Sequence, residues 1–416
     1  METHLADFIR NTQEGIEADA ILRACVHCGF CTATCPTYQL LGDELDGPRG
    51  RIYLIKEVLE GGEATDKSRL HLDRCLTCRA CETTCPSGVQ YGRLADIGRA
   101  VIEDRATVAR PLHDRMLRAG LRYALPRPWL FNPLMAMGQS VRPLLPPSIK
   151  SKVPPYRSPG EKPNAVHKER MLLLDGCVQP AMIPNINSAT ARVLDQAGIS
   201  LVTAPKAACC GAIQHHLSDP AGALDRMRQN IDAWVPFLDQ GVSTIVVNAS
   251  GCAAMIAEYG HLLRDDPVYH ERAGRVSAAM RDVSEVVAGV AERLIPKLAP
   301  PKQNRIAFHP PCTLQHALKI RGTVESLFAA AGIQLQTPRD AHLCCGSAGT
   351  YSILQPKIAK RLRDDKLKKL SEIDAPLIVS ANIGCITHLQ SGTDTPVRHW
   401  IEVLDEALAA SRHVIA

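Results

Sequence analysis

Sixteen cysteines are the residues of this 416-residue chain best suited to chemistry, and all of them fall into two duplicated patterns. The first pattern, C-x2-C-x2-C-x3-C-P, occurs twice at an offset of 50 residues, as Cys25, Cys28, Cys31 and Cys35 and then as Cys75, Cys78, Cys81 and Cys85. Three thiolates spaced by two residues let one loop wrap three corners of a cubane cluster, and the fourth cysteine ligates the other cluster of a pair. The spacing therefore predicts two [4Fe–4S] clusters, one held by Cys25, Cys28, Cys31 and Cys85 and one by Cys75, Cys78, Cys81 and Cys35. Structural zinc, the alternative, favours well-separated cysteine pairs over two complete runs that end in Cys-Pro.

The second pattern contains a vicinal Cys-Cys-Gly, whose glycine lets the backbone approach a metal or ligand closely. Its two copies are Cys177, Cys209, Cys210 and Cys252, and then Cys312, Cys344, Cys345 and Cys385, at offsets of 135, 135, 135 and 133 residues. Four thiolates per copy suffice for one more cluster each, so one or two further iron–sulfur clusters are expected. Buried structural thiols or a redox-active dithiol are the alternatives. If one copy alone binds a cluster, we expect the second, because small or polar residues at 346–347 and 382–384 let backbone N–H groups approach sulfur.

Five histidines accompany these cysteines, namely His27, His309, His316, His342 and His388. A histidine N–H can tune a cluster sulfur. The expectation here is nevertheless ordinary histidines that are hydrogen-bonded or solvated.

The elements that must position the cysteines differ between the two halves of the chain. In the first half, Ile52, Ile55, Val58 and Leu59 follow helical spacing after Pro48, and glycines at 61–62 end the run. In the second half, strand-like segments at 171–174, 244–247 and 377–379 precede cysteines, and helical segments at 189–197 and 324–331 each end at glycine. Such alternation predicts parallel sheets with ligand-bearing loops at the strand ends.

The predicted fold class is therefore α/β overall, with a helical two-cluster ferredoxin-like domain followed by two pseudo-symmetric α/β Cys-Cys-Gly lobes. The expected domains are residues 1–110 for the two-[4Fe–4S] ferredoxin-type domain, 111–165 for a Pro-rich basic linker, 166–300 for the first lobe and 301–416 for the second.

The linker assignment depends on its prolines and its charge. Residues 111–163 contain eleven prolines, far above the ~5% average, which argues against a long helix or a central strand. Trp129, Leu130, Phe131 and Leu134 indicate that this segment lies against something apolar. Residues 110–170 hold twelve Lys/Arg and three Asp/Glu, a local charge of +9. The segment is either a solvated connector or a docking strip for an acidic subunit or an anionic lipid surface.

The sequence lacks the motifs and composition that are typical of several function classes. The glycines form no G-x-G, and there is no G-x-S-x-G or H-E-x-x-H, so no motif would bind flavin or nicotinamide. Aromatic residues are only 4%, which argues against nucleic acid as a partner. No apolar run approaches the ~18 residues needed to span a bilayer, and the first residues do not resemble an export signal. These observations predict a cytoplasmic metalloprotein that is not catalytic alone.

The chain resembles the iron–sulfur subunits of bacterial glycolate oxidase from about residue 15 to the final helix. The resemblance is carried by LRACVHCGFCTATCPTYQLLGDELDGPRGR at 22–51, PCTLQH at 311–316, HLCCGSAGT at 342–350 and ANIGC at 381–385. It implies a complex with two flavin-binding subunits that oxidise glycolate to glyoxylate, and also D-lactate to pyruvate. This chain would pass the electrons to quinone or another membrane acceptor, attached peripherally to the cytoplasmic side of the inner membrane.

The second half is also similar to heterodisulfide reductases and to subunits of anaerobic glycerol-3-phosphate dehydrogenase and of lactate utilisation. An electron-transfer subunit of a related lactate or glycerol-3-phosphate dehydrogenase, a thiol–disulfide enzyme and a purely structural metal scaffold are therefore the alternatives. The full reductase module ends in C-x-x-C, whereas Cys252 has Ala249 and Met255 at that spacing and Cys385 has Asn382 and His388. These departures count against disulfide chemistry.

Overall fold

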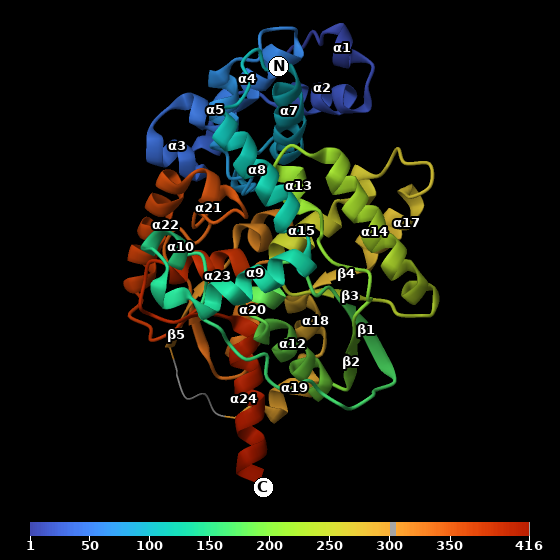
Figure 1. The fold of residues 1–416 in the computed structure, drawn as a ribbon, viewed down its shortest axis with the longest axis vertical. Helices are drawn as coiled ribbons and strands as arrows, with labels where there is room; N and C mark the ends of the chain where they lie inside the picture. The colour runs from blue at the N-terminus through green and yellow to red at the C-terminus, as the bar shows by residue number, and fades with distance from the viewer. Residues whose placement is uncertain (300–304, 416) are drawn as a thin grey trace.

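The computed structural model describes residues 1–299 and 305–415 and places a helical N-terminal region above two α/β lobes (Figure 1). The helical region consists of α1 (Asp7–Arg10), α2 (Gln13–Ala24), η1 (Phe30–Thr34), α3 (Pro36–Leu41), η2 (Glu44–Asp46), α4 (Pro48–Leu59), α5 (Asp66–Asp73), α6 (Ala80–Thr84) and α7 (Tyr91–Arg105). Its apolar core joins α2, α4 and α7 and includes Leu22, Ile55 and Leu94, which are fully buried. The helix predicted after Pro48 is confirmed as α4, and Gly61 follows its end with a φ of 101°.

Each α/β lobe is built on a four-stranded parallel sheet, as the alternation of segments predicts. The first sheet has the order β2-β1-β3-β4 and the second has the same order, β6-β5-β7-β8. The strands of the first sheet are β1 (Glu169–Leu173), β2 (Ile199–Val202), β3 (Ile245–Val247) and β4 (Met280–Asp282). Those of the second sheet are β5 (Arg305–His309), β6 (Gln334–Gln336), β7 (Ile378–Ser380) and β8 (Val397–His399). The strand segments expected at 171–174, 244–247 and 377–379 correspond to β1, β3 and β7.

Helices cover both sheets. In the first lobe they are α11 (Gln179–Met182), α12 (Asn185–Gln196), α13 (Ala212–His216), α14 (Pro220–Asp239), α15 (Ser250–Ala257), α16 (Tyr259–Leu262), α17 (His270–Ala279), α18 (Val283–Gly289), α19 (Ala291–Leu294) and η4 (Ile295–Lys297). In the second lobe they are η5 (Thr313–Ala317), α20 (Thr323–Ala330), α21 (Tyr351–Leu354), α22 (Pro356–Ser371), α23 (Ile383–Gln390) and α24 (Trp400–Ile415). The expected boundary between the lobes, at residues 300 and 301, lies outside the described residues.

The two lobes share one hydrophobic core, which fixes their relative placement. Buried residues of both sheets, such as Val246 and Val379, belong to a single apolar cluster. On the surface of this contact, Arg192 of α12 bonds Asp405 of α24 at 2.7 Å. Nearer the cysteines, the Ser250 N–H donates to the Ala381 carbonyl at 3.2 Å, so the loops after β3 and β7 meet directly.

The linker contains regular helices, which corrects the expectation of a chain without long helix. Residues 112–150 form α8 (Leu112–Ala124), α9 (Pro128–Ser140), η3 (Arg142–Leu144) and α10 (Pro147–Lys150), which cross the front of the molecule (Figure 1). Pro128, Pro143 and Pro147 stand at helix starts, where no intrahelical N–H bond is lost, whereas Pro133 lies inside α9. Trp129 and Leu134 were expected against an apolar surface, but they are 68% and 46% exposed.

Candidate functional site

The first cysteine set lines a small cavity next to the surface. Cys25, Cys28, Cys31 and Cys85, grouped together by their spacing, all line a cavity of about 30 Å³. Burial and the nearby Cys25 thiol raise the pKa of Cys31 to about 11. Cys28 is exposed, whereas Cys25 is buried. This set therefore opens toward solvent at one corner.

The second set, Cys75, Cys78, Cys81 and Cys35, lies deeper. Burial raises the pKa values of Cys78 and Cys81 well above the usual thiol value, and the other cysteines of the set raise them further. Both motif loops use left-handed backbone at matching positions, with φ of 54° and 84° at His27 and Gly29 and of 50° and 58° at Thr77 and Arg79. The same loop geometry thus recurs in both copies, as the repeat predicts.

A buried arginine compensates negative charge at the second set. Arg51 is 1% exposed and donates to the His71 carbonyl at 2.7 Å. Burial raises the pKa of Cys75, but Arg51, Arg99 and the Tyr91 hydroxyl outweigh it, so the pKa is lowered overall. The Tyr91 hydroxyl and the Thr77 N–H donate to the Cys75 sulfur at 3.5 and 3.4 Å. Such donors and cations favour thiolate over thiol, which is the form that binds iron.

The Cys-Cys-Gly loops bring four cysteines together in each lobe. In the second lobe the Cys312 and Cys344 sulfurs are 3.8 Å apart. The glycine N–H after each vicinal pair donates to the first sulfur, from Gly211 to Cys209 at 3.5 Å and from Gly346 to Cys344 at 3.4 Å. The close backbone approach predicted for the second lobe therefore occurs in both. Cys252 and Cys385 lie in the first turns of α15 and α23, slightly beyond the loops in which they were expected.

The second ferredoxin-type set directly adjoins the second lobe. Leu76 and Cys78 pack in one apolar cluster with Cys312, Cys344 and Tyr351. After burial, the Cys312 thiol is the strongest influence that raises the pKa of Cys78. The Tyr351 hydroxyl also donates to the carbonyl of Arg74, the residue before Cys75, at 2.9 Å. The motif loop and the second lobe are thus in direct contact at their cysteines.

The helical region contacts the first lobe mainly through salt bridges. Arg79 and Arg93 bond Glu258 at 2.9 and 3.0 Å. Asp96 of α7 bonds the Nε2 atom of His215, on α13, at 3.1 Å. Burial lowers the pKa of His215, but Asp96 outweighs it and the pKa is raised.

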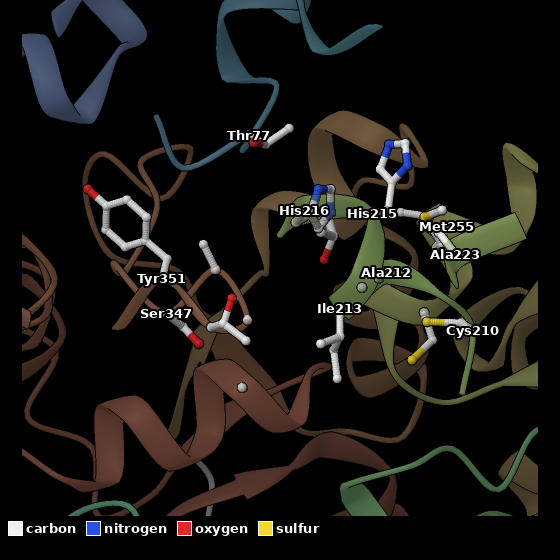
Figure 2. Close-up of a pocket in the computed structure, with 18 of the residues that line it drawn as sticks. Thr77, Cys210, Ala212, Ile213, His215, His216, Ala223, Met255, Ser347 and Tyr351 are labelled. Atoms are coloured by element: carbon white, nitrogen blue, oxygen red, sulfur yellow. The ribbon is translucent and has the colours of Figure 1, made fainter. Parts of the chain in front are cut away.

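A cavity of about 720 Å³ lies where the helical region meets both lobes. Figure 2 shows Thr77 on one side, His215, His216 and Cys210 of the first lobe on another, and Ser347 and Tyr351 of the second lobe opposite. Seven of the eight Cys-Cys-Gly cysteines line it, namely Cys177, Cys209, Cys210, Cys252, Cys312, Cys344 and Cys385. Cysteine-bearing loops of both lobes thus reach the same cavity.

Comparison with known proteins places this arrangement in a family. A 4Fe-4S dicluster domain matches residues 21–89, and a cysteine-rich domain matches residues 171–257 and 306–390. The glycolate oxidase iron–sulfur subunit of Escherichia coli (strain K12) is 52% identical over 409 residues, which cover 98% of this chain and 99% of the relative. The chain belongs to the family of glycolate oxidase iron–sulfur subunits.

Other members and neighbours agree with this assignment. The probable glycolate oxidase iron–sulfur subunit of Bacillus subtilis (strain 168) is 31% identical over 397 residues, 89% of this chain and 88% of the relative. Lactate utilization protein A of Geobacillus thermodenitrificans (strain NG80-2) is 26% identical over 238 residues, 55% of this chain and 95% of that protein. A crystal structure of a hypothetical protein from Helicobacter pylori matches with a TM-score of 0.52 at 11% identity, over 96% of this chain and 73% of that chain, which shows a common fold alone.

The chain is an iron–sulfur electron-transfer subunit that works with other subunits in an oxidoreductase complex. Its donor sets fit iron–sulfur clusters. All sixteen cysteines lie in the described part of the chain and are free thiols. Among the described residues, every helix is too short or too polar to cross a bilayer.

Two of the histidines near the cysteines are hydrogen-bonded as expected, and a third is not. His316 bonds the His342 carbonyl at 2.9 Å and His388 bonds the Ala359 carbonyl at 3.1 Å, as expected for ordinary histidines. His309 is 1% exposed, and neither ring nitrogen has a hydrogen-bond partner among the residues described. The repeat could have singled out His309 in the sequence. The 135-residue offset aligns it with Leu174, so the second copy has a histidine where the first has an apolar residue.

Proposed function

We propose that this subunit carries electrons from two flavin-binding partner subunits to a membrane quinone. The partners would oxidise glycolate to glyoxylate, and also D-lactate to pyruvate. Support for glycolate comes from the 52% identical relative, a glycolate oxidase iron–sulfur subunit, and support for a second hydroxy acid from the lactate utilization relatives. The clusters, when bound by the four cysteine sets, supply one-electron relay chemistry.

One observation carries the proposal: the ferredoxin-type cysteines reach the surface at Cys28 and the second lobe at Cys78. Exposed Cys28 stands beside Val26 and Phe30, which are 67% and 61% exposed. An exposed apolar rim around a redox site is suited to docking a partner protein. Cys78 adjoins Cys312 of the second lobe.

The central cavity is the proposed binding site of the quinone. Its volume of about 720 Å³ includes the space at seven proposed cluster ligands, so the clusters and the quinone would share it. Apolar side chains such as Leu76, Ile97, Phe131 and Met255 line it and suit a quinone ring and the start of its tail. Reduction of a quinone to a quinol consumes two electrons and two protons. His215, held by Asp96 at the cavity wall, is the proposed donor of one of these protons, and solvent supplies the other.

The linker helices would connect this cavity to the membrane surface. Phe131 and Met135 of α9 line the cavity, whereas Trp129, Leu134 and Met137 of the same helix are exposed. The segment also carries the local charge of +9, which suits anionic lipid headgroups. Part of that charge is neutralised within the chain, since Arg110 bonds Asp73 at 2.5 Å. Peripheral attachment through α8 and α9 therefore belongs to the proposal.

The test uses the complete complex with Cys344→Ser and Cys345→Ser together. If a cubane cluster sits there, iron content should fall by about four per chain. Quinone reduction should also slow, while glycolate still reduces the flavin of the partner subunits, because that chemistry lies upstream. Stopped-flow absorbance of the flavin measures the reduction by glycolate, and quinone turnover measures the later electron transfer to the acceptor.

The same change in the first lobe, Cys209→Ser with Cys210→Ser, reports whether that lobe also binds a cluster. Unchanged iron and unchanged quinone turnover in the second-lobe variant would show that its cysteines are only structural thiols. Glycolate:dye activity from the purified subunit alone would contradict the assignment of glycolate oxidation to the partners.

A further inference from the structure

The second lobe contains a buried histidine at a point where three strands deliver donor groups. His309 ends β5, the strand that lies between β6 and β7 in the sheet. Cys345 follows β6, and Cys385 follows β7 in the first turn of α23. The ligand atoms of these three residues all lie within 4.8 Å of one another.

The backbone of His309 is fixed by hydrogen bonds, whereas its imidazole side chain makes none within the described residues. Its backbone pairs with Ser380, whose hydroxyl donates to the His309 carbonyl at 2.8 Å. The imidazole is buried, and both nitrogens are without a partner in the described part of the chain. Burying unpaired polar atoms is costly, so a histidine without partners in a rigid site indicates a ligand.

The duplicated first lobe shows what packing alone requires at this place. Leu174 occupies the equivalent position after β1 and is 2% exposed. An apolar side chain therefore fills the space without difficulty. The imidazole of the second lobe adds a metal-binding nitrogen that the first lobe lacks.

A second difference points the same way. Ala223 in the first lobe and Ala359 in the second are equivalent, because the carbonyl of each lies next to the Cys-Cys-Gly glycine of its lobe. Seven residues further along the chain, the first lobe has Asn230 and the second has Lys366. Lys366 is 3% exposed and donates to the Asp340 carbonyl at 2.7 Å. It is close enough to Cys344 and Cys345 for their charges to interact. A buried lysine thus lies beside the second-lobe cysteines where the first lobe has an uncharged asparagine, although Arg226 acts on Cys209 from elsewhere in that lobe.

We propose that His309 is an iron ligand in the second lobe, which makes its cluster a mixed histidine–cysteine centre unlike that of the first lobe. The inference rests on the proposed cluster in the second lobe. A neutral imidazole in place of a thiolate removes negative charge from the centre and raises its reduction potential. Lys366 acts in the same direction. The centre nearest Cys78 would then be a favourable place for electrons to arrive.

The experiment is pulsed EPR of the full complex, reduced anaerobically, with and without ¹⁵N-labelled histidine. The wild type should show a nitrogen coupling that changes with histidine labelling, because the predicted ferredoxin-type sets contain only cysteine ligands. His309→Leu, which gives the second lobe the residue of the first, should abolish this coupling. His309→Cys should abolish it while iron is retained, and should lower the midpoint potential. His342→Asn, a control in the same lobe, should keep both the coupling and the potential.

The outcomes separate the two proposals. If the Cys344→Ser and Cys345→Ser variant loses iron but the wild type shows no coupling to labelled histidine, the cluster is present and His309 is not its ligand. Persistence of the coupling in His309→Cys would overturn the inference in the same way. If the double serine variant loses no iron, the second-lobe cluster itself is wrong, and this inference falls with it.

Discussion

At the scale of single residues, charged side chains set the protonation of groups that burial alone would leave neutral. Arg51 and Arg99 together lower the pKa of Cys75 although burial raises it. Asp96 likewise raises the pKa of His215 although burial lowers it. In each case the partner comes from a different element, so the effect depends on how the chain folds rather than on local sequence.

The proposed proton donor gives a prediction for Asp96→Asn. With Asp96 present, His215 stays protonated to a higher pH, and quinone reduction should fall as pH rises through that raised pKa. Removing the carboxylate leaves burial, Arg99 and Arg79 to lower the pKa of His215, so the fall should move to lower pH. His216 also faces this pair, with its Nδ1 atom 4.0 Å from the Asp96 carboxylate. Quinone turnover against pH measures the shift.

Glycolate:dye turnover of the same variant is the control, because the partner subunits carry out that reaction. Its pH profile should not move. Equal quinone profiles in variant and wild type would exclude His215 as the proton donor. The ion pair also stabilises the folded state, and because its folded pKa is raised, the His215 contribution is lost as pH rises through it.

At the scale of elements, each Cys-Cys-Gly turn requires its glycine for two reasons. Gly211 and Gly346 have φ of 90° and 88°, in the left-handed region that other residues rarely adopt. A Cβ on Gly346 would also lie 2.6 Å from the Ala359 carbonyl oxygen, whereas on Gly211 it would lie 3.1 Å from that of Ala223. Helices α22 and α14 therefore press on the two turns to different degrees.

We expect Gly346→Ala to destabilise its lobe more than Gly211→Ala. The left-handed conformation alone should cost about 1–2 kcal/mol in either variant. The backbone contact adds to this cost in Gly346→Ala, since a carbonyl in a helix cannot easily move. Gly349→Ala, with a φ of 60° and no atom within 4 Å, isolates the conformational cost. Urea unfolding of the full chain and its iron content provide the comparison, and equal losses in all three variants would contradict it.

At the scale of the whole molecule, the linker helices expose an amphipathic surface that the described chain does not cover. Leu112, Met116 and Tyr123 of α8 are 69%, 66% and 53% exposed, next to basic residues of the same helix. Together with the exposed side chains of α9 they give the linker helices an apolar outer surface. This surface lies beside the cavity that α9 also lines.

Trp129→Asp together with Met137→Asp should weaken attachment to anionic vesicles. The change replaces apolar contact with charge repulsion, so the co-floating fraction of the complex should fall several-fold. Added salt should weaken wild-type binding as well, because it screens the basic segment. Val268→Asp, at an apolar residue of the first lobe that is 64% exposed, is the matched control. If both variants float equally with vesicles, α9 does not contact the membrane.

The sequence by itself determined the groups and elements whose signals are local. Ligand spacing grouped the cysteines, and periodicity identified α4 and the strands β1, β3 and β7, because both depend on neighbours a few residues apart. Only the tertiary structure decided which groups meet across long stretches of chain: Cys78 with Cys312, Asp96 with His215, and His309 with Cys345 and Cys385. Proline content alone gave the wrong expectation for the linker, because a proline at a helix start is compatible with the helix that follows. Contacts between distant segments arise from packing of the shared core, and no local pattern in one sequence encodes them.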